Sequence, residues 1–231
     1  VQDDSVYRKN RRLVALDMDS TLIQQGVMDE LGASQGKRHQ MSQITQKAMN
    51  GELDFKQSFL ERAALLKNVP TSALDEVIAS VELNEGAHRL IKSLRHFGYK
   101  TCLISGGFQE VGDYFANELG IDYVRANRLE IVEGKFTGNV EGEIIDADKK
   151  AELLEDISAS EGISLAQTIA VGDGANDLPM LSKAGLGVAY RAKTVVKEQA
   201  KHAISQFGLD AILYLIGFSD ADIEEALRSA S

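Results

Sequence analysis

The chain has 231 residues, of which 35 are acidic and 25 are basic, so its formal net charge is -10 and its pI is about 4.9. This balance argues against nucleic acid and anionic membrane surfaces as partners, because both attract proteins with a positive surface. With 44% hydrophobic and 26% charged residues, the chain can bury a core and does not have the composition of a disordered protein.

The sequence shows no sign of membrane insertion or secretion. No apolar run reaches the roughly 18 to 20 residues that a spanning helix needs, so we expect no membrane partner. The single cysteine, Cys102, excludes an intrachain disulfide and fits a reducing, cytoplasmic setting. Residues 1–12 are polar and lack the apolar stretch of a signal peptide. Because the chain begins at Val1 rather than Met, we interpret them as the end of a linker in a processed or truncated protein.

Short apolar runs followed by glycine or polar residues predict buried parallel strands. The first covers residues 13–16, directly before Asp17, and three more cover residues 101–104, 168–171 and 186–189. Helical patterns separate these runs. The alternation predicts an α/β fold with a doubly wound parallel sheet and a Rossmann-like core, in which ligands bind at the carboxyl ends of the strands.

The first two strands lie much farther apart than the roughly 30 residues of a strand–helix–strand unit. We therefore predict a small helical cap over residues 25–82, inserted after the first strand, and a core formed by residues 13–24 and 83–218. Helical patterns in the cap cover residues 40–50, 55–67 and 73–81, with Thr71 and Ser72 as candidate N-caps.

The second half of the chain has three further patterns. Residues 108–119 and 147–160 predict helices, and residues 128–140, with Glu133 and Gly134 in the middle, predict a β-hairpin. Residues 219–231 form an acidic tail. Its apolar residues have helical spacing and either pack on the core or mediate contacts; they are Ile223, Ala226 and Leu227.

Carboxylates follow two of the predicted strands. Asp17 and Asp19 lie two apart after the first strand, and Asp173 and Asp177 follow the third. Each pair alone is also compatible with a solvated turn or a capped helix. Together, however, four such groups at one sheet edge would repel one another without a hard cation, and oxygen ligands suit Mg²⁺.

Two basic positions and one glycine pair are candidate anion-binding features. Ser105, Gly106 and Gly107 follow the second strand, where backbone N–H groups and a helix N-terminus favour an anion, although a strand-to-helix turn also explains the glycines. Lys149 and Lys150 fall in the first turn of a predicted helix, where the dipole disfavours cations. Either one bound anion or ordinary solvation accounts for these lysines.

Arg62 projects from an apolar stripe of the helix predicted over residues 55–67. A guanidinium in that position must reach solvent, pair with a buried acid or meet an anionic ligand such as a carboxylate or phosphate. The candidate protein partners are Glu30, Glu85 and Asp54.

The order and spacing of these motifs resemble the haloacid dehalogenase superfamily of phosphatases, and more closely its phosphoserine phosphatase family. The resemblance extends from residue 12 to about residue 215. The segments that carry it are residues 17–22, 48–49, 55, 105–108, 126–129, 138, 141–142 and 171–177.

The resemblance implies a fold of the haloacid dehalogenase kind, a Mg²⁺ cofactor and a small phosphomonoester substrate, O-phospho-L-serine, hydrolysed in the last step of serine biosynthesis. It implies that Asp17 is the nucleophile and that Asp19 is the general acid and base. It implies that Mg²⁺ is held by Asp17, the backbone carbonyl of Asp19 and Asp173, with Asp177 in support. The implied substrate-binding residues are Ser105, Gly106, Lys150 and Asn176 for the phosphoryl group and Arg62 for the carboxylate.

Gly26 departs from the pattern of the family, which usually has a glutamate there that contacts the substrate near its amino group. Three explanations remain: an altered substrate preference, compensation by another acid such as Glu30, or a variant residue in this chain. The alternative functions are therefore a related phosphatase or phosphotransferase for another small molecule, and a phosphate-responsive binding protein without catalysis. The family also often has an N-terminal amino-acid-binding regulatory domain, which is absent from this sequence. Oligomeric state, with a homodimer as one alternative, the position of the cap and the choice of Mg²⁺ or Mn²⁺ are left open.

Overall fold

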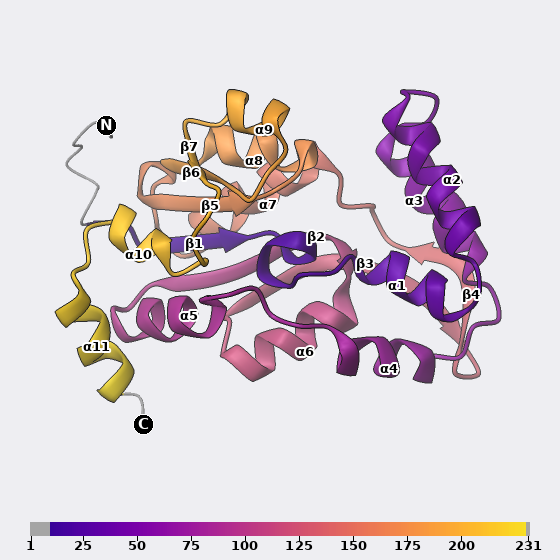
Figure 1. Cartoon of the computed structure of the whole chain (residues 1–231), viewed down its shortest axis with the longest axis horizontal. Coiled ribbons are helices and arrows are strands. Elements are labelled where there is room, and N and C mark those ends of the chain that lie inside the picture. The colour runs from indigo at the N-terminus through magenta and orange to yellow at the C-terminus, as the bar shows by residue number, and fades with distance from the viewer. Residues whose placement is uncertain (1–9, 230–231) are drawn as a thin grey trace.

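A seven-stranded sheet lies between two layers of helices in the computed structural model, which describes residues 10–229 (Figure 1). The strand order is β4-β3-β2-β1-β5-β6-β7, and all neighbouring pairs are parallel except the hairpin β3–β4. The predicted doubly wound α/β sheet is confirmed. The strands are β1 (Leu13–Leu16), β2 (Lys100–Phe108), β3 (Tyr123–Val132), β4 (Lys135–Glu141), β5 (Thr168–Gly172), β6 (Leu186–Tyr190) and β7 (His202–Ile204).

Strand β1 is buried on both faces because its side chains alternate between two apolar clusters. Val14 and Leu16 belong to the larger cluster, which includes residues of α5 (Ala87–His96) and α6 (Gln109–Leu119). Leu13 and Ala15 belong to the second cluster. The helices that cover this opposite face are α7 (Ala147–Ser160) and α8 (Leu178–Lys183).

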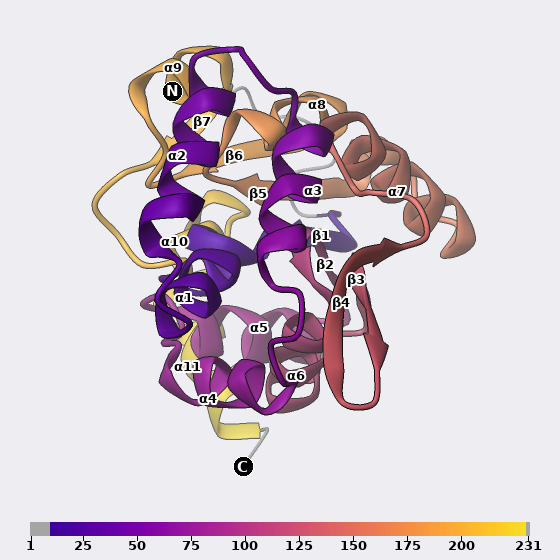
Figure 2. The same cartoon turned by 90° about the vertical axis from the view of Figure 1, so that its right-hand side faces the viewer.

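Four helices connect β1 to α5, after a short π-helical turn η1 (Met18–Leu22). The three predicted helices in this region are confirmed to within two residues at each end, whereas the first, α1, has no counterpart among the predictions. Figure 2 shows α2 and α3 side by side in front of the sheet. The division into cap and core at residues 25 and 82 stays a prediction. The four helices are α1 (Val27–Ser34), α2 (Arg38–Met49), α3 (Phe55–Leu65) and α4 (Ser72–Ser80).

The starts of these helices follow local capping chemistry only in part. The Asp54 side chain accepts a hydrogen bond from the Gln57 backbone N–H at 2.8 Å, and Gln57 returns one to Asp54, so a capping box begins α3. Thr71 occupies the N-cap position of α4, but neither it nor Ser72 caps the helix with its side chain. The Thr71 hydroxyl instead donates to the Gly134 carbonyl at 3.2 Å, because the β-hairpin lies against this loop.

The predicted hairpin is confirmed, with Glu133 and Gly134 at its turn between β3 and β4. Its second strand packs on α3. The Asn68 backbone N–H donates to the Phe136 carbonyl at 2.8 Å, and the Phe136 N–H donates to the Val69 carbonyl at 2.9 Å. The hairpin and the loop after α3 are therefore joined by backbone hydrogen bonds.

The expected strand-to-helix turn at Ser105 is wrong in detail. Strand β2 continues to Phe108, and its pairing with β3 shifts from Ile104↔Arg125 to Phe108↔Asn127. Four steps along β2 thus match two along β3, so residues 105–107 bulge out of the ladder. Helix α6 begins only after them, at Gln109.

The C-terminal tail packs on the core: Ile223 and Ala226 are fully buried, Ile223 belongs to the larger cluster, and α11 contacts α5. The predicted segment 1–12 lies mostly outside the described residues, as do the last two residues of the predicted tail. Within residues 10–229, no helix is long and apolar enough to cross a membrane. The remaining elements are η2 (Leu165–Gln167), η3 (Ala175–Asp177), α9 (Thr194–Gln199), α10 (Ala211–Leu215) and α11 (Asp220–Ser229).

Candidate active site

A buried lysine connects the ends of two strands. Lys150, in the first turn of α7, is fully buried, and its Nζ lies 2.7 Å from Asp17 Oδ1 and 2.7 Å from Asp177 Oδ1. Asp17 follows β1 and Asp177 follows β5. Lys149, by contrast, faces outward and pairs with Glu143 and Glu152. Of the two lysines that the sequence singled out, the fold therefore brings Lys150 to the carboxylates.

The turn η1 holds Asp19 and Thr21 at the end of β1. Its backbone is irregular, with Ser20 at a φ of 61°, so it needs support from elsewhere in the chain. Buried Asn84 supplies this support through its side-chain amide, which donates to the carbonyls of Thr21 at 2.8 Å and Ile23 at 3.1 Å. The Asp19 carboxylate accepts from the Val27 backbone N–H at 3.4 Å, at the start of α1.

The bulge of β2 presents Ser105 and Gly106. Ser105 is buried, and its Oγ accepts a hydrogen bond from the Gly107 backbone N–H at 2.9 Å. Asn127 fixes the bulge from β3, since its amide donates to the Gly106 carbonyl at 2.9 Å and its Oδ1 accepts from the Ile145 N–H at 2.8 Å. Gly106 leaves no room for a side chain, because a Cβ there would lie 2.7 Å from the Phe55 ring.

A small cavity of about 100 Å³ lies where these strand ends meet α3. Arg62 reaches it from α3, with 17% of its side chain exposed. Its ion-pair partner is Asp29 on α1, with Nη1 and Oδ1 3.8 Å apart, and not Glu30, Glu85 or Asp54 as the sequence suggested. Asp54 instead caps α3, and Glu85 pairs with Arg191. The residues that line the cavity are Asp17, Asp19, Met28, Phe55, Phe59, Arg62, Ser105, Gly106, Gly107 and Asn176.

The electrostatics of the site reflect crowded, buried carboxylates. Burial, together with repulsion from Asp177, raises the pKa of Asp17 well above its ordinary value, against the attraction of Lys150. Burial also raises the pKa of Asp19 to about 6 and that of Asp173 to about 6. Burial disfavours the charged amine of Lys150, but Asp17 and Asp177 outweigh it and raise its pKa. The ammonium of Lys150 is thus shared between the carboxylates of Asp17 and Asp177.

The donor set fits a hard divalent cation. Asp17, Asp173 and Asp177 each offer a carboxylate oxygen, and these oxygens lie within 4.8 Å of one another. Asp177 is already engaged, because Oδ1 accepts from Lys150 and Oδ2 accepts from the Gly174 N–H at 2.9 Å. Asp17 Oδ2 accepts no hydrogen bond from the described residues. Oxygen ligands with excess negative charge are what Mg²⁺ prefers.

Comparison with known proteins identifies the family to which this chain belongs. A sequence profile of haloacid dehalogenase-like hydrolases matches residues 14–182. A phosphoserine phosphatase of Streptococcus thermophilus is 46% identical over 204 residues, covering 88% of this chain and 95% of that protein. The chain belongs to the phosphoserine phosphatase family of haloacid dehalogenase-like hydrolases.

Two further relatives of this family bear on length and chemistry. The phosphoserine phosphatase of Streptomyces coelicolor is 47% identical over 221 residues, which cover 96% of this chain but 54% of that protein, so the chain spans about half of its length. A solved structure of a phospho-aspartyl intermediate analogue of a phosphoserine phosphatase is 42% identical. The superposition covers 88% of this chain and 98% of the chain of that structure, with a TM-score of 0.82.

Three residues of the family site were not assigned a role from sequence. Asn84 and Asn127 shape the turn and the bulge, and Asp29 pairs with Arg62. Asn127 falls in a segment that carried the family resemblance, so the sequence did draw attention to it. The sequence alone, however, does not predict that its side chain bonds both Gly106 and Ile145. Asn84 and Asp29 gave no such signal, because their contacts depend on how distant elements pack.

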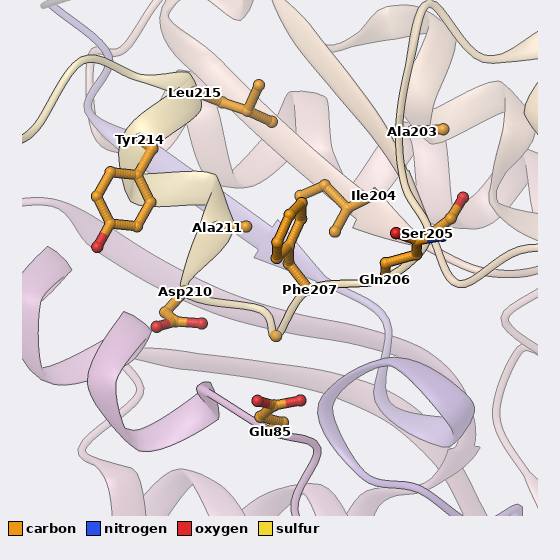
Figure 3. Close-up of a pocket in the computed structure, with 11 residues that line it drawn as sticks. Glu85, Ala203, Ile204, Ser205, Gln206, Phe207, Asp210, Ala211, Tyr214 and Leu215 are labelled. Carbon is orange, nitrogen blue, oxygen red and sulfur yellow. The ribbon is translucent and has the colours of Figure 1, made fainter.

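A larger cavity, of about 810 Å³, lies elsewhere and lacks this chemistry (Figure 3). Apart from Glu85, which precedes α5, its side chains come from β7, α10 and the loop between them, with Phe207, Ile204 and Ala211 facing the hollow. The two acids in its lining already have partners: Glu85 pairs with Arg191 at 3.1 Å, and Asp210 with Arg89 at 3.0 Å. The smaller cavity, with its carboxylates, Arg62 and Ser105, is therefore the candidate active site.

Proposed function

We propose that this chain is a Mg²⁺-dependent phosphatase that hydrolyses O-phospho-L-serine to L-serine and phosphate, the last step of serine biosynthesis. The observation that carries the proposal is one cavity that joins Asp17, Asp19, Ser105 and Arg62, with Lys150 directly behind Asp17. The names of the relatives give the substrate, and the phospho-aspartyl analogue in the family supports a covalent route.

In the first step, a carboxylate oxygen of Asp17 attacks phosphorus while the bond from phosphorus to the serine oxygen breaks. Asp19 gives its proton to that leaving oxygen, which produces serine and an aspartyl-phosphate on Asp17. A pKa of about 6 suits Asp19 to this task, because near neutral pH it exists in both protonation states.

In the second step, a water molecule attacks the phosphorus of the aspartyl-phosphate. Asp19, now a carboxylate, takes a proton from this water, and the bond from phosphorus to Asp17 breaks, so that phosphate leaves and both carboxyl groups return to their starting states. Lys150, Ser105 and backbone N–H groups of the β2 bulge would hold the phosphoryl oxygens, with Gly106 keeping space for them and Asn176 orienting them from the cavity wall.

Mg²⁺, held by Asp17, the Asp19 backbone carbonyl and Asp173 with Asp177 in support, would neutralise charge on the phosphoryl oxygens. The cluster contains three carboxylates, those of Asp17, Asp173 and Asp177, but only one ammonium, that of Lys150. This excess of negative charge supports a divalent cation as the cofactor. The choice between Mg²⁺ and Mn²⁺, a cytoplasmic location and a homodimer stay predictions from the sequence.

The alternative of another phosphomonoester or an alcohol acceptor rested on Gly26, and the relatives do not favour it, because they are named phosphoserine phosphatases at 46% and 47% identity. A binding protein without catalysis is also disfavoured, since Asp17 and Asp19 both line the cavity.

The test is phosphate release from phosphoserine and from a panel of other phosphomonoesters, with Mg²⁺ and with EDTA. We expect kcat/KM to be highest for phosphoserine and release to stop in EDTA. Asp17→Asn should abolish turnover and leave the circular dichroism spectrum unchanged. Most of the activity remaining in Asp17→Asn would refute the assignment of the nucleophile, and a clear preference for another substrate would refute phosphoserine.

A further inference from the structure

The ion pair between Arg62 and Asp29 has an unusual combination of burial and distance. Arg62 is mostly buried, and burial lowers the pKa of its guanidinium, although it stays protonated. Its contact with Asp29 is loose, at 3.8 Å, and 57% of the Asp29 side chain is exposed. Its only other bond within residues 10–229 is a long one, from Nε to the Ser58 carbonyl at 3.4 Å. The pair is therefore close enough to attract and open enough to admit a ligand.

Asp29 does not line the cavity itself but lies beside it, in contact with Arg62 of the cavity wall. One of its oxygens lies 3.8 Å from Arg62, and the other lies 3.8 Å from the place where a Cβ on Gly26 would be. Within residues 10–229, Glu30, the next acid on α1, makes no hydrogen bond or ion pair with any of these groups, so Asp29 is the acid that accompanies Arg62.

We propose that Asp29 binds the ammonium group of the substrate, while Arg62 binds its carboxylate. This inference rests on the proposed phosphoserine activity and adds to it the residue that distinguishes an amino acid from a simple phosphomonoester. Gly26 contributes to the same ammonium-binding site, because the absence of a side chain there leaves the Asp29 carboxylate open to a ligand.

The charges explain why a zwitterion fits this place. An α-amino acid carries an ammonium and a carboxylate on one carbon atom, so it can insert between Asp29 and Arg62 with each charge meeting its opposite. A substrate that lacks the ammonium would leave Asp29 close to the bound carboxylate with nothing between them, which is repulsive. The phosphate group would lie at the other end of the cavity, at Ser105 and in front of Lys150.

The experiment combines a change in the protein with a change in the substrate. The kcat/KM is measured for phosphoserine and for 3-(phosphonooxy)propanoate, which lacks only the amino group, with the full chain, Asp29→Asn and the matched control Glu30→Gln. We expect Asp29→Asn to lower kcat/KM for phosphoserine roughly five- to thirtyfold, since the contact is charged but partly exposed, and to change the other substrate less than about threefold. Glu30→Gln should change neither.

An equal loss on both substrates would show that Asp29 acts only by orienting Arg62, and no loss would show that it does not bind substrate; either result overturns the inference. An amine-dependent loss in Glu30→Gln would also overturn it. These failures leave phosphoserine hydrolysis intact in the unaltered chain. Absence of that hydrolysis would instead refute the proposed function, and the inference with it.

Gly26→Glu gives an independent test, because glutamate at this position would place a second carboxylate beside Asp29. Alone, the change should raise kcat/KM for phosphoserine less than tenfold. Combined with Asp29→Asn, it should restore at least part of the amine-dependent preference. A gain of tenfold or more from Gly26→Glu alone would show that the ammonium has no carboxylate partner in the present chain, which contradicts the role of Asp29.

Discussion

Replacement of Lys150 by methionine isolates the electrostatic contribution of the buried ammonium. Methionine is unbranched and apolar, so it fills most of the same space without a charge. The change leaves Asp17 and Asp177 buried without their shared partner. The matched control is Lys149→Met, one residue earlier on α7, where the lysine pairs with exposed Glu143 and Glu152.

The magnitude follows from the two contacts. At 2.7 Å and an effective dielectric constant of about 20, each contact contributes attraction of about 6 kcal/mol, which is largely offset by the cost of burying the charges. Removing one member of such a buried group lowers the free energy of unfolding by about 3 to 5 kcal/mol, because the remaining carboxylates lose their compensation. Lys149→Met should have a far smaller effect, since its contacts are open to solvent.

The assay is urea denaturation followed by circular dichroism, in EDTA and again in excess Mg²⁺. We expect Lys150→Met to be destabilised by about 3 to 5 kcal/mol in EDTA and to gain more stability from Mg²⁺ than the unaltered chain, because a cation replaces the missing charge. Equal destabilisation by Lys150→Met and Lys149→Met would refute the reasoning, as would a Mg²⁺ response that does not depend on Lys150.

Three further predictions concern the supports of the site. Asn127→Ala removes two hydrogen bonds of a buried side chain and should lower the free energy of unfolding by about 2 to 4 kcal/mol in urea denaturation; a change below about 1 kcal/mol would contradict it. Asn84→Ala releases the η1 turn and should reduce kcat at least roughly tenfold in the phosphate-release assay, whereas unchanged kcat would show that the turn holds its shape alone. Gly138→Ala should destabilise the chain by about 1 kcal/mol more than Gly134→Ala. Both glycines have a positive φ, but only at Gly138 would a Cβ meet the α3 backbone, and equal thermal midpoints would exclude this contact.

The strand tips were predictable because their signals are local. Residues 13–16 form a buried run that stops at a carboxylate, and the same pattern recurs before Asp173. Parallel strands bring such ends to one edge, so pattern and topology together predict that Asp17 and Asp177 approach each other. The helix over residues 147–160 was correct in both bounds, but the burial of Lys150 was not predicted from the sequence, which left a bound anion and ordinary solvation as alternatives.

The remaining features depend on contacts that no local pattern encodes. Strand β7 has three residues, too few to show a period, and α1 is only eight residues long. The extension of β2 to Phe108 depends on pairing with Asn127, and the partner of Arg62 depends on how α1 packs beside α3. Asp29 lies in a helix that the sequence did not predict, and only the packing of α1 gives it Arg62 as a neighbour.

The measurement that tests the central claim most directly is the trapping of a phosphorylated Asp17. The chain is mixed with phosphoserine and Mg²⁺ and quenched in acid within one turnover, and its peptides are analysed by mass spectrometry. We predict the mass of one phosphoryl group on the peptide that contains Asp17, and its absence from Asp17→Asn. Phosphate release without any phosphorylated peptide, or with the group on another residue, would contradict the proposed role of Asp17.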